Sequence, residues 1–263
     1  MKNKTSKKSS VRKEYESSPI IEALVEVHFS QTTTDFTVWA NFNNRLKKSY
    51  PIVEELFIPK TELRITQDRK SGEGRISPEK LLRFYKKDKT QLVQANKDFV
   101  SVNKLKPYSG YEKFIADAER VLKNYIDLTS PKLINRIGMR YINQIIIPET
   151  SVELSAYFRF MPQIPDEVTQ GINNVLLQIQ FTPRNSQHQI MTSLRSDIPS
   201  VEGQTVFFLD IYDILPINNE ADLSIILKSL NEAHENIERV FEGFITDKAR
   251  KLFEVVKNND NKR

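Results

Sequence analysis

The last long stretch of the chain constrains the fold most, because its apolar residues keep helical spacing from residue 223 to residue 256. Steps of three and four residues place apolar side chains on one side of a helix. We therefore predict one amphipathic helix, or two helices joined near Gly243, packed on a sheet formed by the preceding strands. The apolar positions are Leu223, Leu227, Leu230, Ala233, Ile237, Val240, Phe241, Phe244, Ile245, Ala249, Leu252, Phe253 and Val256.

The composition is that of a folded globular protein. A chain of 263 residues with 39% hydrophobic content can bury a sizeable core. No apolar run approaches the roughly 20 residues of a membrane span, and the N-terminus lacks the apolar segment of a secretory signal. The absence of cysteine excludes disulfides, thiol catalysis and cysteine-ligated metals, and fits a reducing compartment. We expect a cytoplasmic protein without a membrane partner or a cofactor.

The positive charge is concentrated at the N-terminus. The formal net charge is +5 and the pI is about 9.1, which raises the question of nucleic-acid binding. The excess is accounted for by Lys2, Lys4, Lys7, Lys8, Arg12 and Lys13. Short basic, serine-rich segments are more often solvated termini than phosphate-binding arms. We predict a basic disordered tail at 1–18 and a polar tail at 258–263.

Residues 19 to 130 contain a first set of periodic segments. The sequence PIIEALVEVHF at 19–29 alternates with period two, which is typical of a half-buried strand. Phe36 to Tyr50 carry apolar residues at helical spacing, and Pro51 ends this predicted helix. Further along we predict short strands at 52–58 and 61–67, a mobile turn-rich loop at 69–78, a hairpin of 81–87 with 90–97, a strand at 98–105 and a helix at 110–126.

Residues 131 to 257 repeat this order. The predicted segments are a long strand at 133–148, a short helical or irregular segment at 152–161, strands at 171–184, 188–196 and 204–215, and the closing helix. We predict an α+β fold of two related halves, 19–130 and 131–257, each built as strand, helix, antiparallel strands and long helix. Such a half resembles the repeat of saddle-shaped sheet proteins, although a shared fold does not transfer function.

The first strands of the two halves carry complementary charges. Placing Glu22 over Arg136 also places Glu26 over Arg140, because both pairs of residues are four apart and share a strand face. If these strands meet around a pseudo-twofold axis, acids of one half face bases of the other. We predict that the four residues form structural charge pairs, which specify register more than they add stability.

Candidate catalytic and metal-binding groups have simpler structural explanations. Glu22 and Glu26 lie about 13 Å apart along a strand, too far to share one ion. Asp210 and Asp213 point to opposite strand faces, which argues against a carboxylate pair. His234 is expected to pack with a hydrogen bond. Neither a serine elbow nor a phosphate loop is present. We predict no catalytic, cofactor-binding or metal-binding residues.

Basic and aromatic residues near 64–87 keep a nucleic-acid interface open as an alternative. Arg83 and Lys86 flank Phe84 and Tyr85, so a basic sheet edge with stacking rings is conceivable. Charged edge strands also protect sheets against aggregation, and we favour this explanation. The candidate nucleic-acid contacts are Lys7, Lys8, Arg12, Lys13, Arg83, Tyr85 and Lys86.

Whole segments of the sequence resemble a sporadically distributed family of uncharacterised prokaryotic proteins, which has a serial designation and no assigned activity. The similar segments are PIIEALVEVHF, QANKDFVSVNKLKPYSGYEKF, RIGMRYINQIIIP and AHENIERVFEGFITDKARKLF. The patchy distribution implied by this resemblance is typical of mobile-element or phage-defence components. Our preferred hypothesis is a non-enzymatic binding or regulatory module that contacts an unknown protein or a second copy of itself. The alternatives are a nucleic-acid binder and an enzyme of unrecognised type.

Overall fold

The computed structural model describes residues 15–30, 32, 36–65, 72–162, 165, 167, 174–196 and 203–254, with the side chains of 36, 60–65 and 72–76 left aside. The fold is α+β, as predicted. Its elements are β1 (Ile20–Ser30), α1 (Phe36–Leu46), β2 (Ile52–Ile65), β3 (Gly72–Tyr85), β4 (Gln91–Asn96), β5 (Phe99–Leu105), α2 (Tyr111–Thr129), β6 (Leu133–Ile147), α3 (Leu154–Tyr157), β7 (Leu176–Phe181), β8 (Gln189–Ser196), β9 (Thr205–Glu220), α4 (Leu223–Phe244), α5 (Asp247–Arg250) and the 3₁₀ turn η2 (Lys251–Phe253).

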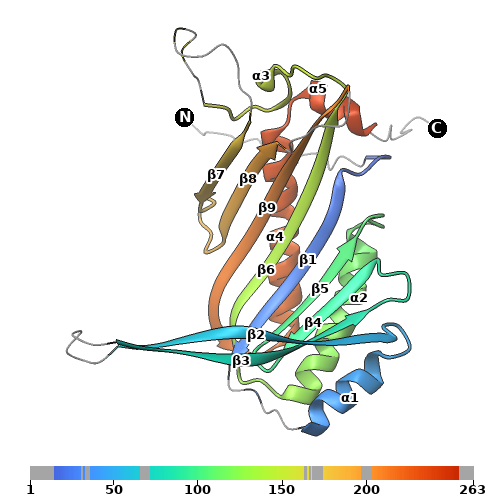
Figure 1. The fold of residues 1–263 in the computed structure, drawn as a ribbon, viewed down its shortest axis with the longest axis vertical. Coiled ribbons are helices and arrows are strands. Elements are labelled where there is room, and N and C mark those ends of the chain that lie inside the picture. Colours follow the sequence, from blue (N-terminus) through green and yellow to red (C-terminus); the bar gives the residue numbers. More distant parts are fainter. Residues whose placement is uncertain are drawn as a thin grey trace, which may run out of the picture.

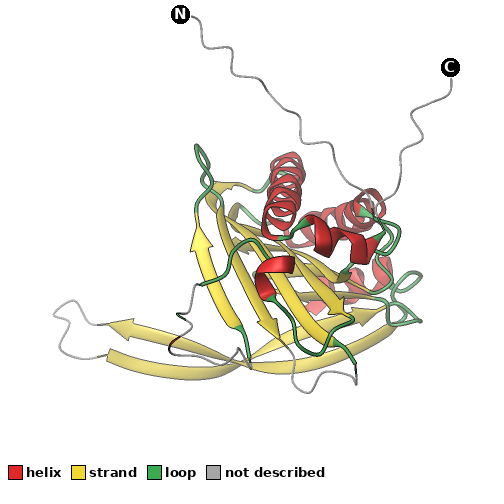
Figure 2. Cartoon of the chain, turned by 90° about the horizontal axis from the view of Figure 1, so that it is seen from above, coloured by secondary structure: helices red, strands yellow, loops and turns green. Residues whose placement is uncertain are grey.

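The nine strands of the described residues belong to one antiparallel sheet in the order β2-β3-β4-β5-β1-β6-β9-β8-β7 (Figure 1). The pairing of β1 with β6 connects residues 19–130 to residues 131–257, since these two strands lie side by side along nearly their whole length. The long helices α1, α2 and α4 lie together on one face of the sheet, and the opposite face carries none of them (Figure 2). We call this opposite side the open face.

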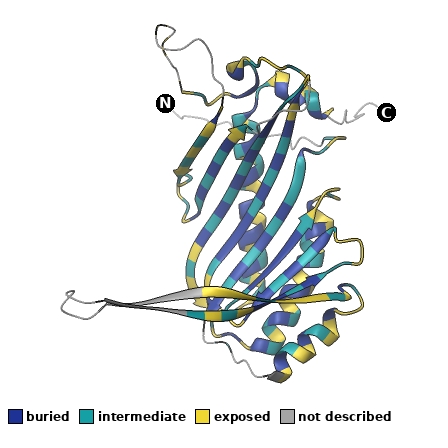
Figure 3. Ribbon diagram, in the orientation of Figure 1, coloured by how far each residue is buried: buried dark blue, intermediate teal, exposed yellow. Residues whose placement is uncertain are grey.

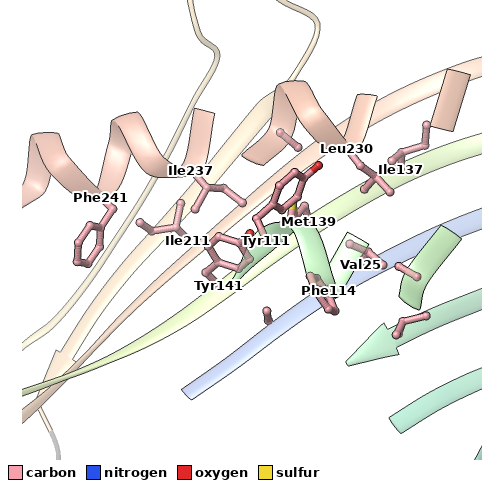
Figure 4. Close-up of a cluster of buried hydrophobic side chains, with 14 of the residues drawn as sticks. Val25, Tyr111, Phe114, Ile137, Met139, Tyr141, Ile211, Leu230, Ile237 and Phe241 are labelled. Atoms are coloured by element: carbon pink, nitrogen blue, oxygen red, sulfur yellow. The ribbon is translucent and has the colours of Figure 1, made fainter. Parts of the chain in front are cut away.

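The hydrophobic core lies between the sheet and these helices. The alternating side chains Ala23, Val25 and Val27 of β1 are fully buried there, whereas their neighbours on the open face are only partly buried (Figure 3). From α4, Leu230 and Ile237 point at β6 and β9 (Figure 4). The predicted alternation of β1 and the predicted apolar side of the closing helix are thus confirmed, and both pack into one core.

The N-terminal and C-terminal ends of the described chain meet. The Tyr15 ring packs edge-on against Phe241 and Phe253, and the Glu16 amide donates to the Glu254 carbonyl at 2.9 Å. The last residues of the predicted N-terminal tail therefore contact the fold. Residues 1–14, including Lys7, Lys8, Arg12 and Lys13, and residues 255–263 lie outside the described residues.

The prediction for residues 52–78 was correct in part. Residues 52–65 are extended as predicted, but they form one strand, and residues 72–78 of the predicted loop belong to the next strand, so that β2 and β3 form one long hairpin paired from Ile52 with Tyr85 to Ile65 with Gly72. Pro78 of β3 lies opposite Pro59 of β2, and β4 pairs only with residues 82–85, so position 78 has no strand on its other side that would need a backbone N–H. The hairpin runs across the open-face side of the molecule (Figures 1 and 2).

One predicted helix end shifts, and one predicted break is observed. The first helix ends at Leu46 rather than Tyr50, because the Leu46 carbonyl accepts from both Ser49 and Tyr50 in a closing turn. The closing segment divides into α4 and α5 near Gly243, as predicted. The break lies at Ile245, whose backbone is extended, and the Thr246 side chain caps α5 by accepting from the Ala249 amide at 3.3 Å.

None of the described helices is long and apolar enough to span a membrane.

Candidate functional site

A network of charged and polar side chains covers the centre of the open face. The period-two alternation of β1 sends Glu22, Leu24, Glu26 and His28 to this side, and the antiparallel pairing sets Arg136 of β6 opposite His28. These side chains are partly covered by one another and partly exposed to solvent. We call the residues Glu22, Glu26, His28, Arg136, Arg140, Asp210 and Tyr212 the open-face network.

Glu26 is the centre of this network. Its Oε1 atom accepts from Arg136 Nη2 at 2.8 Å and from the Tyr212 hydroxyl, and it lies 3.3 Å from His28 Nε2. Only 13% of the Glu26 side chain is exposed. Desolvation alone would raise the pKa of Glu26, but hydrogen bonds from His28 and Tyr212 and the charges of His28 and Arg136 outweigh it, so the pKa is lowered. Glu26 is thus held as a carboxylate.

Gly138 makes room for this arrangement. It lies between Glu26 on β1 and Ile214 on β9 in the strand register. A Cβ atom at this position would lie 2.8 Å from Tyr212 Cε2 and 3.1 Å from Glu26 Cγ. The missing side chain lets the Tyr212 ring cross β6 and bring its hydroxyl to Glu26.

A second ion pair lies beside the first. Arg140 forms a two-pronged contact with Asp210, with Nε to Oδ1 at 2.8 Å, and its guanidinium lies 6.0 Å from the Tyr212 ring centroid. The Asp210 hydrogen bond raises the pKa of Arg140, partly opposed by desolvation, and the charges of Asp210 and Glu22 also favour the cation. Glu22 itself accepts from Asn103 Nδ2 at 2.7 Å.

The predicted charge-pair residues therefore gather in one place. Because β1 and β6 are antiparallel, Glu26 meets Arg136 directly and the charge of Glu22 acts on Arg140. The main partner of Arg140 is Asp210, which the sequence-based pairing did not include. The position of Asp210 on the polar side of the alternating strand β9 was the available signal for this contact.

The candidate nucleic-acid contacts within the described residues do not share one surface. Arg83 Nε donates to Gln94 on β4 at 3.0 Å, on the open-face side. Lys86 instead turns to the helix side, where its Nζ lies 3.2 Å from Asp117 of α2 and over the Tyr50 ring. Tyr85 is partly buried and pairs with Leu92 in the sheet. Strand alternation thus places Arg83 and Tyr85 on one side of β3 and directs Lys86 to the other.

The helix-covered face contains a buried ionic cluster that sequence reasoning missed. His188 Nδ1 lies 2.5 Å from Asp213 Oδ1, and Asn236 of α4 donates to the other oxygen at 2.9 Å. The Asp213 side chain is fully buried. The hydrogen bond to Asp213 raises the pKa of His188 despite desolvation, and Glu232 adds to this effect. The available signal was a carboxylate at an apolar position of the β9 alternation.

His234 packs as predicted. Its ring stacks on Tyr111 at a centroid distance of 3.7 Å, and its Nδ1 atom lies 3.0 Å from the Tyr141 hydroxyl. Burial raises the pKa of Tyr141. These contacts connect α2, α4 and β6, so the group consolidates the core.

Among the described residues, no group of three or more His, Cys, Asp or Glu could hold a metal ion. A depression of about 710 Å³ near the start of β8 is open to solvent, and its lining contains neither carboxylates nor histidines: Thr182, Gln187, Gln189, Pro216, Ile217, Asn218 and Asn219.

Neither a protein-family model nor a curated protein sequence matches this chain.

Proposed function

We propose that the protein is a binding module that recognises a protein partner with the open face of its sheet. The observation that carries this proposal is the open-face network, in which fixed hydrogen-bonding groups lie on a surface that none of the long helices covers. Holding polar side chains in place before binding lowers the ordering cost of association. Fixed donors and acceptors of both charge signs suit the mixed surface of a protein.

The charge balance of the open face favours a protein over a nucleic acid. Arg136 and Arg140 already have the carboxylates of Glu26 and Asp210 as partners. A phosphate backbone would have to compete with these carboxylates and would meet their negative charge. The nucleic-acid alternative therefore depends on the concentration of positive charge in residues 1–13.

We also infer that the fold arose by internal duplication. The strands run outward from the centre as β1, β5, β4, β3, β2 on one side and β6, β9, β8, β7 on the other. The long helices α2 and α4 follow at matching positions of the chain.

Capture of partners from the native cell tests the proposed function. The tagged full-length protein is compared with Arg195→Glu, which reverses an exposed charge on the open face beside Phe208. Lys228→Glu is the matched control, because this side chain is 79% exposed on α4 at the opposite side. We expect mass spectrometry to find the same protein with the wild type and the control, and several-fold less of it with Arg195→Glu.

Equal capture by Arg195→Glu would contradict a role of the open face. The resemblance to a sporadically distributed family leads us to look first for partners encoded with mobile elements or phage-defence systems. Enrichment of DNA or RNA instead of protein would favour the alternative. That binding should weaken steeply with salt and be lost when Lys7, Lys8, Arg12 and Lys13 are neutralised.

A further inference from the structure

The two edges of the sheet differ in how they are protected against strand pairing. An edge strand presents unpaired N–H and C=O groups, and proteins commonly guard such edges with charges and proline. The edge strand β2 carries the exposed residues Glu54, Glu55 and Pro59, and Glu55 forms an ion pair with Lys80. This edge therefore carries protective charges and a proline beside its exposed apolar residues Val53, Phe57 and Ile58.

The other edge strand, β7, carries no such protection in its own sequence. Its sequence LLQIQF contains neither a charged residue nor a proline. Leu176 is 80% exposed, and Gln178 and Gln180 are exposed on the same side. Leu177 and Phe181 point to the other side, where they pack partly against the core. β7 pairs with β8 alone among the strands of the sheet.

We propose that a second copy of the protein pairs with β7 through its own β7, antiparallel and about a twofold axis. An axis centred on Gln178 or on Ile179 sets residues of the same face opposite each other, because both registers preserve the period of two. The two sheets then continue into one another with both open faces on the same side. The pairing brings no like charges together, since β7 has none.

The internal arrangement of the sheet also supports a further strand beside β7. If β7 corresponds to β3, as the proposed duplication implies, then β3 is flanked by β2 while β7 lacks a tenth strand. The dimer itself rests on the unprotected edge and does not depend on the open-face function. Pairing of six-residue strands buries less than a standard interface of about 1,600 Å², so the association should be weak and concentration-dependent.

Sedimentation velocity with the full-length protein from about 1 to about 100 μM tests this proposal. The wild type should shift from monomer to dimer over this range. The variant Gln178→Lys with Gln180→Lys places lysines opposite lysines in either register, and it should dimerise at least about tenfold more weakly. Both positions are exposed, so the variant should fold, and its thermal melt checks this. Glu54→Lys on β2 is the control and should dimerise like the wild type.

A charge-swap experiment separates edge pairing from general repulsion. Mixing the double lysine variant with Gln178→Glu and Gln180→Glu should restore dimers, because opposite charges then face each other. A monomeric wild type at all concentrations would overturn the proposal. It would also be overturned if the lysine variant dimerised as well as the wild type, or if the mixture formed no mixed dimer.

Discussion

The two faces of β9 use the same residue types for different purposes. Asp210 on the open face pairs with Arg140, and both side chains keep contact with water. Three residues later, Asp213 pairs with His188 in complete burial beneath α4. Phe207 and Phe208 divide in the same way between core and open face. We therefore expect burial to decide how much each side chain contributes to the stability of the fold.

The largest contrast is expected for the two adjacent phenylalanines. Phe207 is 2% exposed and packs edge-on against Phe158 at 5.2 Å, so Phe207→Ala should leave a cavity and cost about 3–5 kcal/mol in the free energy of unfolding. Phe208 contacts Arg195 on the partly exposed side, and Phe208→Ala should cost about 1 kcal/mol. Denaturant unfolding measures both, and equal costs would contradict the assignment of the two faces.

The two aspartates provide the next contrast. Asp213→Asn leaves His188 without its charged partner in a buried site and should destabilise the protein by about 3 kcal/mol. Asp210→Asn acts on a pair whose arginine is 41% exposed, and solvent screening should limit the cost to about 1 kcal/mol. The two losses in unfolding free energy can be compared directly, because both substitutions remove one charge from the same strand. A larger loss of unfolding free energy in Asp210→Asn than in Asp213→Asn would contradict this account.

The buried pair also predicts a pH dependence. Because the folded-state pKa of His188 is raised above its ordinary value near 6.5, its stabilisation is fully present below pH 6.5. The contribution is lost as the pH rises through the folded pKa. Unfolding experiments from pH 6 upwards should therefore show a decline for the wild type that is reduced in His188→Gln. An unchanged pH profile in this variant would show that His188 does not supply the titration.

The smallest effect is expected within the open-face network. Glu26→Gln and Arg136→Gln, combined in a double-mutant cycle, should give a coupling energy of about 1 kcal/mol, because Arg136 is 42% exposed. The same cycle with Glu26 and Arg140 serves as control and should give less, since Arg140 is bound to Asp210. A coupling energy of zero would show that the contact between Glu26 and Arg136 contributes nothing to stability.

Much of the fold followed from local patterns. The alternation of residues 19–29 and the helical spacing of 223–244 predicted β1 and α4, because each element buries one side and the sequence records that side. The long β2–β3 hairpin was not predicted, since Gly72, Gly74 and Pro78 read as a loop. A strand can include these residues because β4 does not pair with this part of β3, and local sequence does not show that.

The site was predictable only in part. Charge and spacing predicted that Glu22, Glu26, Arg136 and Arg140 form charge pairs, because they lie on the first strands of the two predicted halves. The direct contact of Glu26 with Arg136 follows from the antiparallel pairing of β1 with β6. The contributions of Tyr212 and Gly138 could not be predicted, since they depend on β9 being the strand that pairs with β6 on its other side. His188 and Asp213 are 25 residues apart, and only the pairing of β8 with β9 brings them together.

Hydroxyl-radical footprinting of the captured complex tests the binding role of the open face most directly. Met191 and Phe208 lie on this face, whereas Phe160 beyond α3 is 49% exposed and serves as the internal reference. We predict that the partner lowers the labelling of Met191 and Phe208 and leaves that of Phe160 unchanged. Unchanged labelling of Met191 and Phe208 in a fully formed complex would contradict recognition through the open face.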